Sequence, residues 1–128
     1  MEIGQTTQMT IFAGAPWNDT GVDLEQGAIY QLTAEGEWFD AWVKSDADGY
    51  DSKGWPQQHF ESALRLPTAR WFCLVGAIDR ELDAAFQIGC SRAVAAPSSG
   101  RLFCFANDVP GFYFNNFGSV QLTIRREG

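Results

Sequence analysis

Short segments in which apolar and polar residues alternate follow one another along the chain, separated by glycine, proline and acidic residues. Alternation with a period of two is typical of strands that bury one face. The run 71–78 is apolar throughout, which is expected of a strand covered on both faces. The pattern predicts strands at residues 9–12, 22–24, 29–33, 38–43, 71–78, 85–88, 92–95, 101–106 and 119–125.

Helical periodicity is weak everywhere, and its best candidate lies around residues 57–66. Parallel sheets need crossover helices between their strands, so the lack of such helices favours antiparallel pairing. Many short strands divided by turn residues predict an all-β chain, a jelly-roll-like β-sandwich of two antiparallel sheets. The length of 128 residues and a hydrophobic fraction of 45% suit one domain, spanning residues 1–128, with one packed core.

Residues 107–118 form a connection longer than a hairpin requires, and they hold one carboxylate and three side-chain amides. Ca²⁺ takes about six to eight oxygen ligands from such groups and from main-chain carbonyls. A Pro-Gly pair inside the loop bends the backbone, which would let Asp108, Asn115 and Asn116 converge on one ion. Aspartate and asparagine are also common turn residues, so the residues alone leave open a loop without a metal.

This segment resembles the signature of the PA-IL (LecA-type) bacterial lectins, which bind galactose through calcium. The matching positions are Asn107-Asp-Val-Pro-Gly111, Tyr113, Asn115-Asn116 and Gly118-Ser119. The resemblance is closest from residue 99 to residue 124, and it is weaker but colinear through 21–27, 34–38 and 71–78. It implies a galactose-binding-domain-like sandwich in which one Ca²⁺ bridges the protein and the sugar hydroxyls.

Carried over position by position, the resemblance implies two overlapping sets of residues. The ion would be held by the side chains of Asp108, Asn115 and Asn116, by the main-chain carbonyl of Phe112, and by Asp40 through its carbonyl or carboxylate. The sugar would be contacted by Asp108, Asn115, Asn116, Val109, Trp55, Pro56 and Gln58. The family has a His-Pro-Asp-Gln stretch where this chain has residues 55–58, so only the proline and the last glutamine are retained. Trp55 would either stack on the apolar face of a pyranose or obstruct the site.

The charge and the N-terminal residues narrow the possible partners. The formal net charge is −7, and the basic residues are scattered except for Arg125 and Arg126. Nucleic acids and anionic membranes bind to positive patches, so neither partner is expected, and no apolar run is long enough to span a bilayer. The first residues, including Glu2, are unlike a secretory signal. The expectation is a cytoplasmic protein, one exported by a non-classical route, or one whose signal has been removed.

Aromatic residues are more numerous than a core of this size needs, with ten phenylalanines and five tryptophans. Some rings are therefore expected at a surface that meets a partner. Lectins commonly gain avidity by joining weak sites, which predicts a homo-oligomer. Trp38, Trp42 and Trp71 are expected in the core or in subunit contacts. The three cysteines, at positions 73, 90 and 104, lie in apolar segments without zinc-motif spacing and are expected to be buried free thiols.

Two other groups of residues are weak candidates for chemistry. Asp46, Asp48 and Asp51 resemble the start of an EF-hand loop but lack its closing glutamate, so a solvated acidic loop is favoured over a second cation site. His59 is the only histidine, and no nucleophile motif accompanies it.

The sequence therefore predicts a calcium-dependent carbohydrate-binding protein that is not an enzyme. One alternative is a structural or protein-interaction module whose loop has lost its ligand. The aromatic residues Phe112, Phe114 and Phe117, two of which replace small residues of the family beside the ion, favour that alternative. The other alternative is a small hydrolase, for which no pair of facing carboxylates is marked in the sequence.

Overall fold

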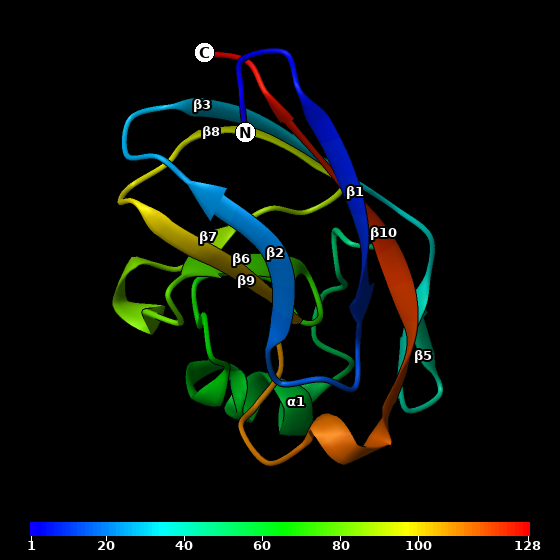
Figure 1. The fold of residues 1–128 in the computed structure, drawn as a ribbon. Coiled ribbons are helices and arrows are strands. Elements are labelled where there is room, and N and C mark those ends of the chain that lie inside the picture. Colours follow the sequence, from blue (N-terminus) through cyan, green and yellow to red (C-terminus); the bar gives the residue numbers. More distant parts are fainter.

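The longest strand, β10 (Asn116–Arg126), is the centre of the larger of two antiparallel sheets in the computed structural model, which describes residues 1–128 (Figure 1). It pairs with β1 (Thr6–Phe12), β3 (Ile29–Glu35) and β4 (Trp38–Asp40). β5 (Val43–Ser45) pairs with β4, and β8 (Ser91–Ala95) pairs with β3. These pairings complete a sheet of six strands.

The smaller sheet has four strands. Their order is β2 (Asn18–Leu24), β9 (Gly100–Ala106), β6 (Leu74–Ile78) and β7 (Phe86–Gln87). All pairings in both sheets are antiparallel. The all-β sandwich predicted from the alternating pattern is therefore confirmed. None of the helices combines the length and the apolar character needed to cross a membrane.

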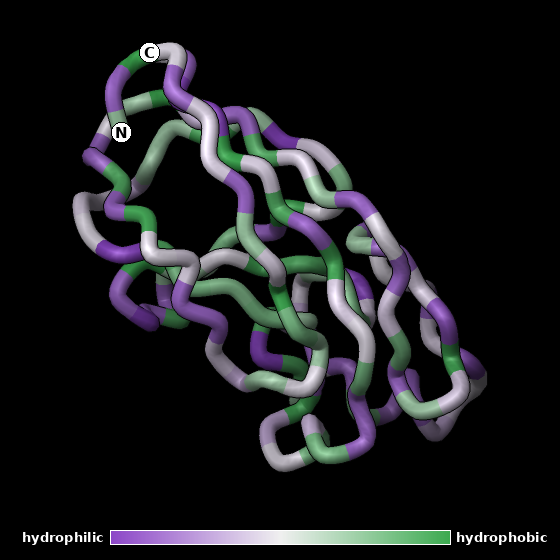
Figure 2. Tube along the Cα trace, turned by 45° about the vertical axis from the view of Figure 1, so that its right-hand side comes forward, coloured by the Kyte–Doolittle hydropathy of each residue, from purple (hydrophilic) through white to green (hydrophobic).

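Alternation along the strands turns every second side chain into the space between the sheets. In β10, the side chains of Val120, Leu122 and Ile124 are at most 1% exposed, while Gln121 and Arg125 are exposed. Figure 2 shows the resulting mixture of hydrophobic and hydrophilic residues along the strands. A cluster of 25 buried residues spans both sheets, and the removal of its apolar surface from water is the main force that holds them together.

The stretch 38–43, predicted to be one strand, is instead a tight hairpin made of β4 and β5. Its turn residue Ala41 has φ 55°, a left-handed conformation that glycine or asparagine usually supplies. Because neither stands there, the sequence carries no turn signal. Trp42 is 90% exposed at this turn, so it does not lie in the core, and its other predicted role, a subunit contact, stays a prediction. Trp38 and Trp71 are buried as expected.

Other predicted boundaries also shift. The predicted helix 57–66 is two short pieces, α1 (Trp55–His59) and the 3₁₀ turn η1 (Glu61–Ala63). The apolar run 71–78 is buried throughout, but its strand begins only at Leu74, because Phe72 has φ 64°. All three cysteines are free, and two of them are buried as expected, while Cys90 is half-buried.

The segment before β6 and the loop after β9 meet at the end of the sandwich that lies away from the two termini (Figure 1). The side chain of Asn107, which is completely buried, joins them. Its oxygen accepts a hydrogen bond from the Leu66 amide at 3.0 Å, and its nitrogen donates to the carbonyls of Leu66 at 2.9 Å and Arg70 at 3.0 Å. The start of the loop is thereby fixed against residues 66–70.

Replacing Asn107 with alanine is expected to lower the free energy of unfolding by about 2–4 kcal/mol, because buried main-chain groups then lose their partners. Urea unfolding measures the change. The matched control is Gln26→Ala, which removes an exposed amide and is expected to change stability by less than about 0.5 kcal/mol. Equal stability of the two variants would show that the Asn107 contacts do not hold the loop.

Candidate functional site

The register of the large sheet brings the ends of two strands together. Asn116, the first residue of β10, is paired with Asp40, the last residue of β4. The Asn115 carbonyl accepts a hydrogen bond from the Ala41 amide at 3.1 Å. The Asn116 side-chain nitrogen donates to Oδ2 of Asp108 at 2.9 Å. Two carboxylates and two side-chain amides, from segments far apart in the sequence, thus gather at one place.

Asp108 is held at this place by its own backbone contacts. Its Oδ1 accepts a hydrogen bond from the Val109 amide at 2.7 Å, and its main-chain carbonyl accepts one from the Arg65 amide at 3.2 Å. The side chain is only 3% exposed. Its orientation is therefore determined by protein contacts on both sides of the carboxylate.

A cavity of about 300 Å³ opens over these groups. It is lined by Asp40, Pro56, Gln57, Phe60, Trp71, Asp108, Val109, Phe112 and Asn115. Six of the residues predicted for the metal or the sugar are in this lining, and Asn116 is buried next to Asp108. Trp55 and Gln58 are exposed on α1 and are not among the lining residues. The mixture of apolar walls and a few polar groups is typical of a small-molecule site.

Two amide oxygens in this cluster are unsatisfied. Oδ1 of Asn115 and Oδ1 of Asn116 are buried and have no hydrogen-bond partner. A buried acceptor without a donor costs roughly 1–3 kcal/mol, and native proteins contain few of them. Asn116 is hydrogen-bonded to Asp108 through its side-chain nitrogen, and Asn115 lines the same cavity as Asp108. Amide oxygens are hard ligands, so a hard cation among these residues would satisfy the two acceptors that lack a hydrogen-bond donor. The residues present therefore fit a Ca²⁺ ion.

The two carboxylates are harder to ionise than exposed aspartates in the absence of such a cation. Burial raises the pKa of Asp108 to about 6, although the hydrogen bonds from Asn116 and Val109 partly oppose this, and the charge of Asp40 adds to it. Burial also raises the pKa of Asp40, against the effect of the hydrogen bond from Tyr50. A divalent cation favours the charged form of both groups, which is the opposite of what burial does.

The structure adds residues to the site that the sequence did not reveal. Gln57, rather than Gln58, lines the cavity, and its side-chain nitrogen donates to the Tyr50 hydroxyl at 2.7 Å. That hydroxyl in turn donates to Oδ2 of Asp40. Phe60 and Trp71 supply apolar wall. Only the place of Gln57 within the tetrapeptide 55–58 could have indicated its role, because the helical turn decides which of the two glutamines faces inward.

A wider depression of about 630 Å³ continues from this cavity and shares Asp40, Pro56, Gln57 and Asn115 with it. The hairpin of β4 and β5 supplies Trp42 and Lys44 to its lining. The site therefore extends from the buried carboxylates to an exposed tryptophan at the rim.

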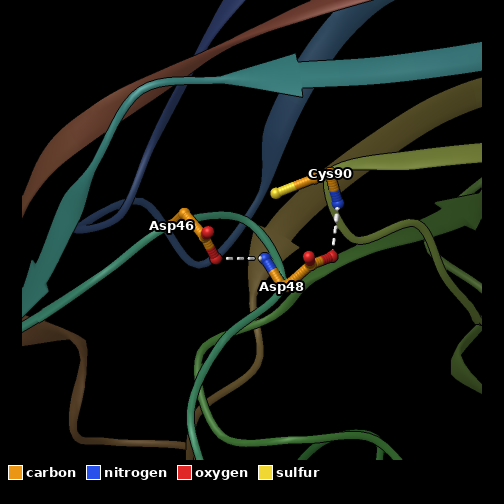
Figure 3. A group of neighbouring side chains, drawn as sticks. All are labelled: Asp46, Asp48 and Cys90. Atoms are coloured by element: carbon orange, nitrogen blue, oxygen red, sulfur yellow. Dashed lines mark hydrogen bonds between the residues drawn. The ribbon is translucent and has the colours of Figure 1, made fainter.

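The acidic loop considered as a second cation site is built differently. Asp51 pairs with Arg70, at 3.2 Å from Oδ1 to Nε. Ligand atoms of Asp46, Asp48 and Cys90 lie within 4.8 Å of one another, but the Asp48 carboxylate accepts the Cys90 amide at 2.7 Å (Figure 3). Burial and the neighbouring carboxylates raise the pKa of the Cys90 thiol, which disfavours the thiolate that a metal requires.

His59 does not belong to the cavity. It is exposed at the end of α1, where its ring meets those of Trp55 and Phe60 edge-on, and it lines neither this cavity nor the wider depression.

Comparison with known proteins gives one informative result. No protein-family model matches the chain, and no curated protein matches it. Among solved structures, the chain is similar to one described as "EclA N-terminal domain; PllA-like lectin". The TM-score is 0.72 at 21% sequence identity, over 94% of this chain and 95% of that chain. At this identity the similarity establishes the shared sandwich fold alone.

In the absence of metal, the free energy of unfolding is expected to fall as the pH rises from about 4 to about 6. Asp108 loses its proton near pH 6 in the folded chain but near pH 3.9 in the unfolded chain, so the folded state binds more protons in this window. Urea unfolding in excess chelator, repeated across this range, measures the fall. In Asp108→Asn the fall is expected to be smaller by about 2 kcal/mol. The same slope in both proteins would contradict the raised pKa.

Proposed function

We propose that this protein is a lectin that binds a galactose-like sugar through a Ca²⁺ ion and does not transform it. The observation that carries the proposal is the pair of buried, unsatisfied oxygens of Asn115 and Asn116 beside the buried carboxylate of Asp108. An arrangement that is costly without a cation and satisfied by one favours a metal site over an ordinary turn.

Asp108, Asn115 and Asn116 would hold the ion through their side-chain oxygens, and Asp40 and the main-chain carbonyl of Phe112 would complete the protein ligands. When bound, the ion supplies coordination of two neighbouring sugar hydroxyls. Asp108 adds a charge-assisted hydrogen bond to one of them, which is stronger than a bond between neutral groups.

The walls of the cavity suit the remaining surface of a pyranose. Phe60, Phe112 and Trp71 offer apolar surface to the C–H groups of the ring, and Gln57 offers an amide for an outlying hydroxyl. Galactose is proposed because the loop 107–118 resembles that of the galactose-binding lectins, and the solved structure with a similar fold is described as a lectin.

Assembly into a homo-oligomer is part of the proposal. Several large apolar side chains remain exposed, among them Trp42 at 90%, Phe114 at 81% and Phe117 at 54%. Rings exposed to this degree are enriched at protein interfaces. Sedimentation at micromolar concentration tests the assembly, and a strict monomer would count against it.

Calorimetric titration of galactose is expected to give heat of binding with Ca²⁺ present and none in excess chelator. Asp108→Ala is expected to weaken this binding by about 30-fold or more, because it removes both a metal ligand and a sugar contact. Ca²⁺ at about 100 times its Kd is expected to stabilise the normal protein by about 2.7 kcal/mol and the variant by much less.

The control is Asp83→Ala, which removes an exposed carboxylate outside the cavities and is expected to retain full binding. Ca²⁺ stabilisation without galactose binding would retain the metal site and require a different glycan. The absence of any Ca²⁺ effect would favour the interaction module that has lost its ligand. Turnover of chromogenic glycosides, lost in Asp108→Ala, would instead favour the hydrolase.

A further inference from the structure

A second cavity, of about 430 Å³, lies on the other side of the loop that covers the proposed calcium site. Its lining consists of Pro16, Trp17, Arg65, Leu82, Pro110, Gly111, Tyr113 and Phe114. Loop residues divide between the two cavities, since Val109, Phe112 and Asn115 line the first one. We call this second space the Arg65 cavity. Its walls are mainly apolar or aromatic, and Arg65 is its single charged side chain.

Arg65 carries a charge that no carboxylate balances. Arg70, Arg101, Arg125 and Arg126 each pair with an acidic side chain, but Arg65 forms no salt bridge, although the chain has 16 acidic residues. Arg80 and Arg92 also lack such a partner, yet neither lines a cavity. The Tyr113 hydroxyl beside Arg65 is a phenol, which is neutral at pH 7 and does not balance the charge.

The guanidinium of Arg65 is fixed in position by contacts that leave one edge free. Its Nη1 donates to the Pro16 carbonyl and, at 3.0 Å, to the Tyr113 hydroxyl. Its carbon lies 3.6 Å from the ring centroid of the buried Phe105 and 4.3 Å from that of Trp17. The Nε and Nη2 atoms make no hydrogen bond within the protein. These two atoms form the edge with which arginine binds both oxygens of a carboxylate.

We propose that the Arg65 cavity binds a carboxylate carried on a six-membered ring, with the acid group on the free edge of Arg65 and the ring against Trp17 and Phe114. Charge complementarity selects the anion, because the cavity holds an unbalanced cation and no acidic side chain. The aromatic and proline walls select a ring over a bare inorganic anion. Both an acidic sugar residue of a glycan and a free aromatic acid carry this chemistry.

The position of Arg65 is tied to the proposed calcium site through the backbone. Its amide donates to the main-chain carbonyl of Asp108 at 3.2 Å, while the Asp108 side chain lines the first cavity. The carboxylate site itself requires no metal. It therefore stands independently of the proposed lectin function.

The test is a titration of the ¹⁵N-labelled full chain, in excess chelator, followed by NMR. The probes are benzoate and methyl glucuronoside, each compared with its neutral counterpart, benzyl alcohol or methyl glucoside. At least one acid is expected to shift the Arg65 Nε–H and the Trp17 indole N–H saturably, and to bind at least tenfold more tightly than its counterpart. Binding of the glucuronoside alone identifies a glycan ligand, and binding of benzoate alone identifies an aromatic acid. Binding of neither acid, or equal binding of acid and neutral probe, overturns the proposal.

Arg65→Gln is expected to weaken binding of the acid at least tenfold, because the charge and the two-atom edge are both lost. Arg92→Gln is the matched control, since Arg92 also bonds a carbonyl and has no carboxylate partner, and it is expected to leave the affinity unchanged. Unchanged affinity in folded Arg65→Gln overturns the proposal.

Because Arg65 also supports two loops, Phe114→Ala provides a second variant, at a side chain that is 81% exposed. It is expected to fold normally and to bind the acid about threefold more weakly; unchanged affinity overturns the placement of the ring and with it the proposal. The chelator makes the two hypotheses separable. A lack of calcium-dependent galactose binding leaves these results intact, and a failure here leaves the lectin proposal intact.

Discussion

The register of strand β10 is the constraint on which both the core and the site depend. The strand pairs with β1, β3 and β4, so its position is determined by three partners at once. Because side chains alternate between the two faces of a sheet, a slip of one residue would turn the buried side chains of Val120, Leu122 and Ile124 to solvent. The same slip would separate Asn116 from Asp40, which it opposes at the other end of the strand. The buried side chains of Val120, Leu122 and Ile124 thus fix the register of β10, and this register keeps Asn116 opposite Asp40 in the site.

Without a metal ion, the site lowers the stability that the core provides. Two amide oxygens are buried without partners, and burial raises the pKa of both carboxylates, so the metal-free cluster is polar, desolvated and incompletely satisfied. Such groups persist only where the surrounding structure determines their positions. Asn107 is part of that surrounding structure, because its buried side chain joins the loop to residues 66–70. An ion entering such a preorganised cluster would gain ligands without first having to order them.

The features that could be predicted from the sequence are those determined by residues close to one another in the chain. The alternating pattern predicted the two-sheet sandwich, because a period of two directly encodes one buried face, and the loop 107–118 was marked by its amides and its carboxylate. The hairpin at Ala41 was missed because its left-handed backbone is imposed by strand pairing without a glycine or asparagine to signal it. Gln57 was missed because one turn of helix decides which of two adjacent glutamines faces the cavity. Nothing in the sequence around Arg65 indicated its role, since its aromatic neighbours come from three separate segments and meet only in the folded chain.

The loop between β9 and β10 separates the two cavities, and this limits which insertions and substitutions the loop can accept. Val109, Phe112 and Asn115 line one cavity, while Pro110, Gly111, Tyr113 and Phe114 line the other. An insertion here would displace walls of both cavities at once and would also separate Asp108 from Asn116, whose side chains are hydrogen-bonded at 2.9 Å. Substitution is less restricted, because Phe112 and Phe114 are largely exposed and their rings can change without disturbing the hydrogen bonds that fix the loop. The backbone of the loop therefore serves the proposed metal site, whereas its exposed side chains are free to adjust which ligand each cavity accepts.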